Sequence, residues 1–263
     1  MVEHPSFRKP VPSPAHARWE RRHLRLVQGT GIVPLVDSVE ASAVVTMEGA
    51  GSLADLLAEV GRLDEAACRA VGLGVGAAIA RVHSSGLVHG DVKPSNVVFA
   101  PEGGLWLVDF DAAGPAGAPR RRSSSGRAVH GPELAFTDDV VALASTVVEC
   151  ATGKVVDPTV AWSTGALEQL GCPPPLAVDA ADVLRGDAGL DTFVLRLGRR
   201  PARLPGPGTR RGTVDPTPTV DVPTTVIAGL APPSSPSPTH EVGEQMCGTR
   251  NSAHPLRKFR RSG

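Results

Sequence analysis

The sequence predicts an α+β domain over residues 1–199 and a disordered tail over residues 200–263. Before residue 200, amphipathic helical patterns alternate with short strand patterns, which is typical of α+β domains. After it, eleven prolines stand among threonines and serines, with few large apolar residues between them. Such a segment buries too little apolar surface to offset its ordering entropy, so we expect it to be disordered.

The first elements that we expect are a helix over residues 15–28 and two short strands over 32–36 and 43–47. In the helix, apolar residues recur at a spacing of three and four, and each strand is a short apolar run. Ser52 then precedes an apolar-periodic segment and is a good helix N-cap, so a second helix is expected over residues 53–60.

A longer helix is predicted over residues 64–83, where valines and an isoleucine repeat at helical spacing. A strand–turn–strand follows over residues 96–110, with Gly103-Gly104 as its turn. Next we expect an irregular loop over residues 112–131 and an apolar helix over residues 138–151, and weaker helical patterns continue from there to about residue 199.

Residues 72–77 inside the longer helix, GLGVGA, fit the loose dinucleotide-binding pattern G-x-G-x-x-G/A, and they contain three glycines, Gly72, Gly74 and Gly76. That pattern requires a strand before it, and here it lies within a helical period. We therefore interpret these glycines as sites of close packing between helices.

Composition excludes several classes of protein. The 27 Lys and Arg balance the 27 Asp and Glu, which argues against a globally basic nucleic-acid binder. The four cysteines form no CxxC pair, so we expect neither a zinc site nor a disulfide framework, and a reducing cytoplasmic location fits best. No signal peptide is visible, and no apolar run is long enough to span a bilayer.

The residues that carry chemistry lie between positions 88 and 111. Asp91, Asn96 and Asp109 supply hard oxygen ligands, and the predicted hairpin returns Asp109 to the side of Asn96. Oxygen ligands that converge in this way suit Mg²⁺ held against phosphates. Lys93 adds a point charge for a phosphoryl group in transfer, and a further Asp can orient a hydroxyl nucleophile.

Residues 89–96, HGDVKPSN, resemble the catalytic loop H-R-D-L-K-P-x-N of eukaryotic-type protein kinases, in their bacterial Ser/Thr branch. Residues 109–111, DFD, resemble the D-F-G motif of the same family. Pro132-Glu133 resembles the end of the activation segment, and Asp139 resembles the helical Asp that anchors the catalytic loop from below.

The resemblance implies a protein-kinase-like two-lobe fold. Residues 1–48 would form an incomplete N-lobe, since no glycine-rich strand pair precedes the first helix, and residues 49–199 would form a mostly helical C-lobe. Gly90 stands where the family has arginine, which implies activation without phosphorylation of the loop.

The resemblance also implies roles toward ATP and Mg²⁺. Asp91 would orient the substrate hydroxyl, and Lys93 would meet the γ-phosphate. Asn96 and Asp109 would hold Mg²⁺.

Five further residues would bind the nucleotide. Glu20 falls at the position of the helical glutamate that pairs with a strand lysine, and Lys9 is the lysine able to be its partner, although a solvated terminal lysine is an equally good interpretation. The backbone of Glu48 and Ala50 would face adenine, and Val98 would pack under it.

The function implied is that of an ATP-dependent serine/threonine protein kinase acting on a protein substrate. A pseudokinase or scaffold without turnover is the first alternative, because the glycine-rich loop is missing. An aminoglycoside-type small-molecule phosphotransferase is the second, because that family shares H-G-D and often D-F-D. It usually carries His where this chain has Lys93, however, and it lacks the Pro-Glu ending.

Overall fold

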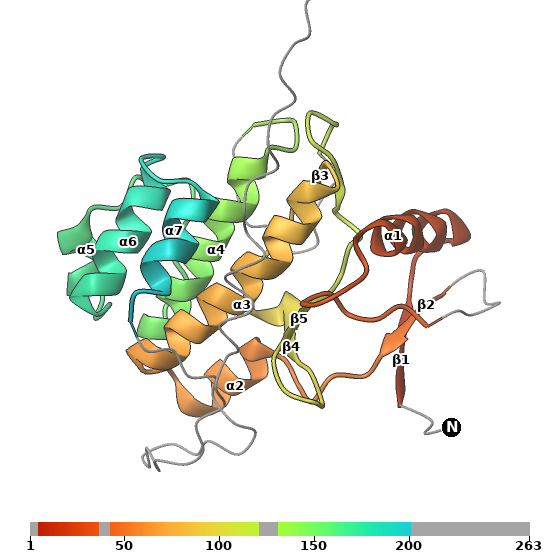
Figure 1. Ribbon diagram of the computed structural model, residues 1–263, viewed down its shortest axis with the longest axis horizontal. Coiled ribbons are helices and arrows are strands. Elements are labelled where there is room, and N and C mark those ends of the chain that lie inside the picture. The colour runs from red at the N-terminus through yellow and green to blue at the C-terminus, as the bar shows by residue number, and fades with distance from the viewer. Residues whose placement is uncertain (1–4, 37–42, 121–130, 201–263) are drawn as a thin grey trace, which may run out of the picture.

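The structure is a computed structural model that describes residues 5–36, 43–120 and 131–200. The tail that we predict to be disordered, apart from Arg200, lies outside these residues. Two groups of elements are visible in Figure 1: α1, β1 and β2 on one side, and the helices α3 to α7 on the other. The hairpin of β4 and β5 lies between them. The division of the chain at residue 48 stays a prediction.

The smaller group is a two-stranded sheet with one helix beside it. Strand β1 (Ser6–Pro10) runs antiparallel to β2 (Ala43–Met47), and Lys9 lies opposite Val44. The sequence predicted β2 but not β1, whose five residues show no apolar alternation and are mostly exposed.

Helix α1 (Pro14–Val27) confirms the first predicted helix. Its N-cap is Ser13, whose hydroxyl accepts from the amide of His16, and Pro14 occupies the first turn, where its missing N–H costs nothing. Glu20 lies on the buried face of the helix and is only 2% exposed. The helix therefore directs the Glu20 carboxylate toward the interior of the protein.

The strand predicted over residues 32–36 is wrong. The segment forms only isolated bridges, from Ile32 to Leu107 and from Leu35 to Thr46. Pro34 lies between them and has no N–H to continue a ladder, so the chain crosses from one neighbour to another instead of pairing along one strand.

The larger group is built on two long helices, α3 (Glu65–Ser84) and α4 (Phe136–Thr152). Three further helices pack with them, namely α5 (Thr164–Gln169), α6 (Pro174–Leu184) and α7 (Leu190–Leu197). Helix α2 (Leu53–Val60) confirms the helix predicted after Ser52, which forms a capping box with Asp55. No helix among the described residues is both long and apolar enough to cross a membrane.

The glycines of α3 allow close helix packing, as predicted. A Cβ built on Gly72 would lie 2.5 Å from Leu197 Cδ1, and one built on Gly76 would lie 2.6 Å from Val194 Cγ2. Both contacts are with α7. The interpretation of this segment as a site of close helix packing is confirmed at Gly72 and Gly76, whereas Gly74 faces Leu105 in the predicted hairpin.

The predicted hairpin is present as β4 (Val97–Phe99) and β5 (Leu105–Leu107), which pair antiparallel. Its turn contains Gly103 and Gly104 with φ of 96° and 92°, values that favour glycine. A 3₁₀ turn at Pro94–Asn96 leads into β4.

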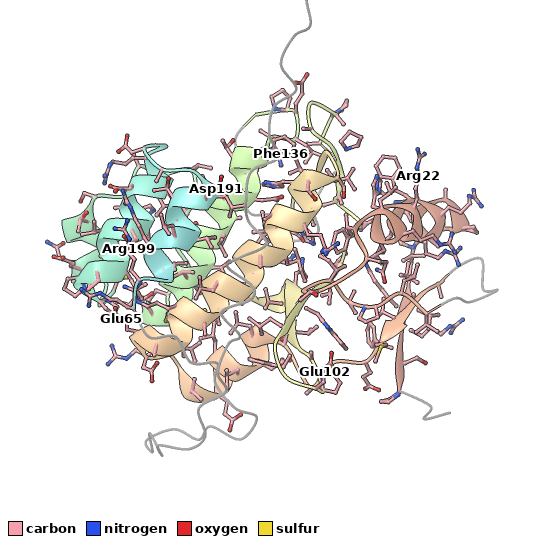
Figure 2. The ribbon with its side chains drawn as sticks, viewed as in Figure 1. Arg22, Glu65, Glu102, Phe136, Asp191 and Arg199 are labelled. Carbon is pink, nitrogen blue, oxygen red and sulfur yellow. The ribbon has the colours of Figure 1, made fainter. Side chains whose placement is uncertain are left out.

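A second short antiparallel pair is formed by β3 (Leu87–Val88) and β6 (Gly114–Pro115). Charged side chains such as those of Arg22, Glu102 and Asp191 stand on the outside of the molecule (Figure 2). The core is one cluster that includes much of α3 and α4 and extends to Leu24 of α1 and Val44 of β2.

Candidate active site

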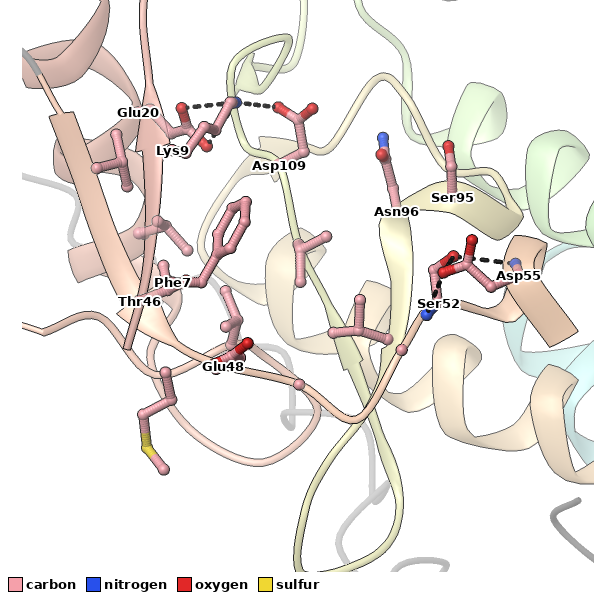
Figure 3. Close-up of a pocket in the computed structure, with 18 residues that line it drawn as sticks. Phe7, Lys9, Glu20, Thr46, Glu48, Ser52, Asp55, Ser95, Asn96 and Asp109 are labelled. Carbon is pink, nitrogen blue, oxygen red and sulfur yellow. Dashed lines mark hydrogen bonds and ion pairs between the residues drawn. The ribbon is translucent and has the colours of Figure 1, made fainter. Parts of the chain in front are cut away.

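A cavity of about 480 Å³ opens between the two-stranded sheet and the hairpin of β4 and β5 (Figure 3). Its volume is within the usual range for small-molecule and cofactor sites. We call the two groups of elements the smaller and the larger lobe, and the hairpin, which packs on α2 and α3, belongs to the larger lobe. Lys9 and Thr46 line the cavity from the sheet, and Asn96, Val98 and Asp109 line it from the hairpin region.

Lys9 joins two carboxylates at one end of this cavity. Its Nζ lies 2.9 Å from Glu20 Oε2 and 2.7 Å from Asp109 Oδ1. Lys9 and Asp109 are 100 residues apart in the sequence. The interpretation of Lys9 as an isolated terminal lysine does not fit this geometry, because both of its partners are drawn from other elements.

Burial and charge act against each other in this cluster. Burial lowers the pKa of Lys9, but Glu20 and Asp109 outweigh it and raise the pKa above its ordinary value. Burial raises the pKa of Glu20, and the charge of Lys9 only partly offsets the shift. Burial also acts to raise the pKa of Asp109, but the hydrogen bond from Lys9 and its charge lower it overall.

Asp109 has an unusual backbone conformation, and the residue after it is fixed by packing and by a hydrogen bond. It has a φ of 63°, and among the described residues it is the only one other than glycine with positive φ. Its neighbour Phe110 is fully buried and donates its amide to Glu20 Oε1 over 3.2 Å. The Phe110 ring also meets the ring of His89 edge-on at 4.7 Å. A strained conformation of this kind is found where the surrounding structure fixes it, often at functional sites.

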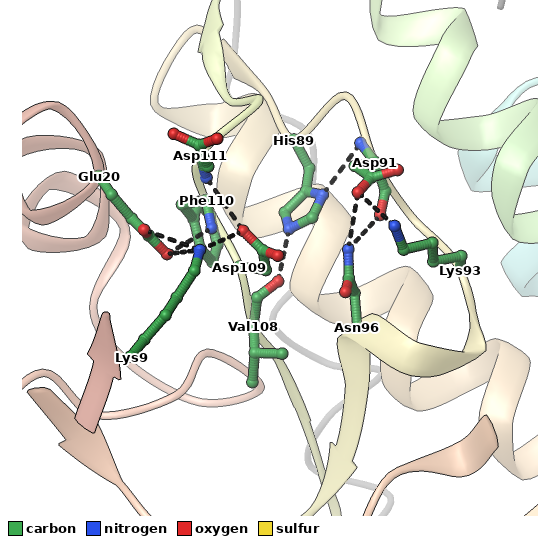
Figure 4. A network of polar contacts seen from close by, with 10 residues as sticks. All are labelled: Lys9, Glu20, His89, Asp91, Lys93, Asn96, Val108, Asp109, Phe110 and Asp111. Atoms are coloured by element: carbon green, nitrogen blue, oxygen red, sulfur yellow. Dashed lines mark hydrogen bonds and ion pairs between the residues drawn. The ribbon is translucent and has the colours of Figure 1, made fainter. Parts of the chain in front are cut away.

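The loop at residues 89–96 forms a second polar cluster (Figure 4). Lys93 Nζ lies 2.7 Å from Asp91 Oδ2. The Asn96 side-chain amide donates to the Asp91 carbonyl over 2.8 Å and to its carboxylate over 3.1 Å. These bonds orient Asn96 so that its side-chain oxygen is turned away from Asp91.

Asp139 supports this loop from below. It is 1% exposed, and its carboxylate accepts the amides of His89 and Gly90, each over 2.8 Å. His83 Nε2 lies 2.9 Å from the same carboxylate. Gly90 has a φ of 78°, and a Cβ there would lie 3.1 Å from the Ala112 carbonyl oxygen, so glycine suits this position.

Asn96 and Asp109 have the donor chemistry of a Mg²⁺ site. Both line the cavity, and Figure 3 shows their side chains at the same end of it. An amide oxygen and a carboxylate are hard ligands, and Mg²⁺ is usually held by one or two such groups together with phosphate oxygens and water. No cluster of three or more acidic, His or Cys side chains suited to a metal occurs in the described part of the chain.

Two of the three residues expected around the base line the cavity, and the third does not. Val98 and Glu48 line the cavity, whereas Ala50 is not among its lining residues. The Ala50 amide instead donates to the Phe99 carbonyl over 2.8 Å. The roles of these three residues toward adenine stay predictions.

The sequence reasoning missed one residue that lines the cavity and one that lies beside the site. Phe7 lines the cavity from β1, two positions before Lys9 and on the same face of the strand, but β1 shows no sequence pattern from which this could be predicted. Trp19 on α1 donates its Nε1 to the Ala113 carbonyl over 3.0 Å, which joins α1 directly to the segment after Asp109. No sequence pattern predicts this hydrogen bond.

Comparison with known proteins agrees with this geometry. Residues 5–133 match the protein kinase domain family. Over these residues, the chain belongs to the protein kinase family.

Two bacterial relatives show how far the similarity extends. The serine/threonine-protein kinase PknD of Mycobacterium tuberculosis is 32% identical over 137 residues, which are 46% of this chain and 20% of PknD. The serine/threonine-protein kinase AfsK of Streptomyces griseus is 30% identical over 149 residues, which are 49% of this chain and 18% of AfsK. The similarity therefore spans about a fifth of each of these relatives.

Proposed function

We propose that this kinase chain is an ATP-dependent serine/threonine protein kinase. The observation that carries the proposal is the joining of Lys9, Glu20 and Asp109 in one ion-paired cluster, in the same cavity as Asn96. A lysine and hard oxygen ligands gathered in one cavity support the binding of nucleotide phosphates there. The names of the relatives support the serine/threonine class.

In this proposal each polar group has one task. Lys9, held by Glu20, binds the α- and β-phosphates, and Lys93 meets the γ-phosphate. Asn96 and Asp109 hold Mg²⁺, which when bound offsets phosphate charge. Asp91 accepts the proton of a Ser or Thr hydroxyl. The hydroxyl oxygen bonds to the γ-phosphorus, the bond between this phosphorus and the β–γ bridging oxygen breaks, and ADP leaves.

The test is phosphoryl transfer from γ-labelled ATP with Mg²⁺ to a generic basic protein, with the full chain as enzyme. We expect label on serine and threonine, and a loss of at least 100-fold in the Asp109→Asn variant. Asp187→Asn is the matched control, because Asp187 is an exposed carboxylate in the larger lobe paired with Arg185.

Two results would reject the proposal and point to the alternatives. Nucleotide binding without label on any acceptor would identify a pseudokinase. Label on kanamycin and not on protein would identify a small-molecule phosphotransferase.

A further inference from the structure

A buried ion pair joins the segment after Asp109 to helix α4, outside the cavity of the candidate active site. Arg120 Nη2 lies 2.7 Å from Asp138 Oδ2, and the two side chains are only 14% and 2% exposed. Neither residue lines the cavity, and the proposed function gives neither of them a task. Two charges held this far from water require a fixed geometry to offset their desolvation, so the pair holds its two segments in one arrangement.

Arg120 belongs to a short two-stranded platform, which consists of residues 117–120 and 131–134. Three backbone hydrogen bonds of 2.8 to 2.9 Å pair the two stretches, and Pro119 lies opposite Glu133 in an antiparallel bridge. Both of these residues are exposed. The platform therefore presents extended backbone to solvent.

The Arg120 guanidinium links this platform to α4. It donates to the Glu133 carbonyl over 3.0 Å and to the Gly131 carbonyl over 3.3 Å, in addition to its bond with Asp138. Asp138 also accepts the Ala135 amide over 2.6 Å at the start of the helix. A planar guanidinium serves several acceptors at fixed angles, which the single ammonium of a lysine does not. One side chain thus fixes both the pairing within the platform and its position on α4.

The platform also contacts the loop that carries Asp91. Leu134 is 3% exposed, and a Cβ built on Gly90 would lie 3.1 Å from its Cδ2. Asp139, the neighbour of Asp138, accepts the Gly90 amide over 2.8 Å. Adjacent carboxylates of one helix therefore hold the platform and the loop. A platform that moves away from α4 also moves relative to Asp91.

We propose that Arg120 is a positioning residue for the protein substrate, and that it acts by anchoring the platform to α4 through Asp138. This inference rests on the proposed function and deepens it. A Ser or Thr hydroxyl presented to Asp91 is part of a peptide chain, and the platform is exposed backbone on which the neighbouring residues of that peptide can lie. The anchor therefore affects how a protein is seated, and it leaves nucleotide binding unchanged.

The experiment compares the wild-type full chain with Arg120→Met and with the double variant Arg120→Met/Asp138→Asn. It measures kcat/KM for a generic basic protein in the transfer assay, ATP affinity by displacement of a fluorescent mant-ADP probe, and melting temperature. Arg120→Met should lower kcat/KM for the protein by about 10- to 100-fold and leave ATP affinity unchanged. Its melting temperature should fall, because Asp138 is left buried without its cation.

The double variant separates positioning from simple charge balance. It removes the uncompensated carboxylate, so its melting temperature should return close to that of wild type. Its kcat/KM for the protein should stay low, because the platform has lost its anchor. Arg185→Met is the matched control, because Arg185 is ion-paired with Asp187 elsewhere in the larger lobe, and its loss should change neither kcat/KM nor ATP affinity.

Four results would count against the positioning role. Wild-type kcat/KM in Arg120→Met, or its recovery in the double variant together with the melting temperature, would overturn the role while the kinase proposal stands. A double variant as unstable as Arg120→Met would overturn it as well, since Asp138 would not be the partner of the anchor. Weaker ATP binding by Arg120→Met would assign the effect to the nucleotide and overturn it. A wild-type chain that transfers no phosphate overturns both proposals.

Discussion

The ammonium nitrogen of Lys9 lies 2.9 Å from a carboxylate oxygen of Glu20, across the space between strand β1 and helix α1. The same nitrogen lies 2.7 Å from Asp109, at the end of the hairpin segment in the other lobe. One side chain therefore ties together three elements.

Removal of Lys9 should cost both activity and stability. Lys9→Met leaves the buried Glu20 carboxylate without its cation, which should lower the free energy of unfolding by about 2 kcal/mol, less than for a fully buried pair because Lys9 is 28% exposed. Phosphoryl transfer should fall by about 100-fold or more. Urea unfolding and the transfer assay measure the two effects. Arg8→Met, on the other face of β1, is the control. Equal results for both variants would exclude the proposed role of Lys9.

The pH dependence of stability should reveal Glu20. Its pKa is raised in the folded protein above the ordinary value of 4.5, mainly by burial, so the folded state binds its proton more tightly than the unfolded state. As pH rises from 4.5 through the folded pKa, wild type should therefore lose stability relative to Glu20→Gln, and the difference should level off above it. Urea unfolding of both proteins at a series of pH values measures this. If wild type instead gained stability relative to Glu20→Gln as the pH rises, the pKa of Glu20 would not be raised in the folded protein.

Trp19 should couple α1 to the segment after Asp109. Trp19→Phe keeps the ring but removes the donor to the Ala113 carbonyl, at a cost of about 1 kcal/mol in stability. We expect kcat to fall several-fold, with a smaller change in KM for ATP. Trp162→Phe is the matched control, because its Nε1 donates over 2.9 Å to Asp157 in the larger lobe. Steady-state kinetics of both variants measure kcat and the KM for ATP. Wild-type kcat in Trp19→Phe would remove the coupling role.

Gly90 should be needed for activity as well as for stability. Its positive φ favours glycine, and a side chain there would also contact the segment after Asp109. Gly90 and Gly86 have φ of 78° and 72°, so alanine at either position should cost about 1–2 kcal/mol. Only at Gly90 would the new Cβ meet other atoms, 3.1 Å from the Ala112 carbonyl oxygen. We therefore expect kcat to fall about tenfold in Gly90→Ala alone, with similar thermal shifts in both variants. Equal kcat values would show that the loop tolerates the contact.

Sequence reasoning recovered what depends on neighbours in the chain. Helix α2 follows from the Ser52 N-cap, and the hairpin of β4 and β5 follows from Gly103-Gly104, because caps and turns are local signals. Asp91, Lys93 and Asn96 were likewise expected together, since they are within six positions of one another, and their side chains are in contact.

The features that sequence reasoning missed depend on residues that are distant in the sequence. Strand β1 is held by pairing to β2, more than thirty residues later, and its own residues show no strand pattern. The same distance left Lys9 ambiguous, because Asp109 is 100 residues away. The bond from the Ala50 amide to the Phe99 carbonyl was not foreseen either, because it depends on how the chain between β2 and α2 folds onto β4.

The most direct test of the central claim is single-turnover transfer from ATP by wild type and by Asp91→Asn, with ATP affinity measured on the same samples. Asp91 should act on the substrate hydroxyl and not on nucleotide binding, so the variant should bind ATP as wild type does. Its transfer rate should be about 100- to 10,000-fold slower, the usual contribution of a general base. A variant that transfers phosphate to serine and threonine at the wild-type rate would contradict the account.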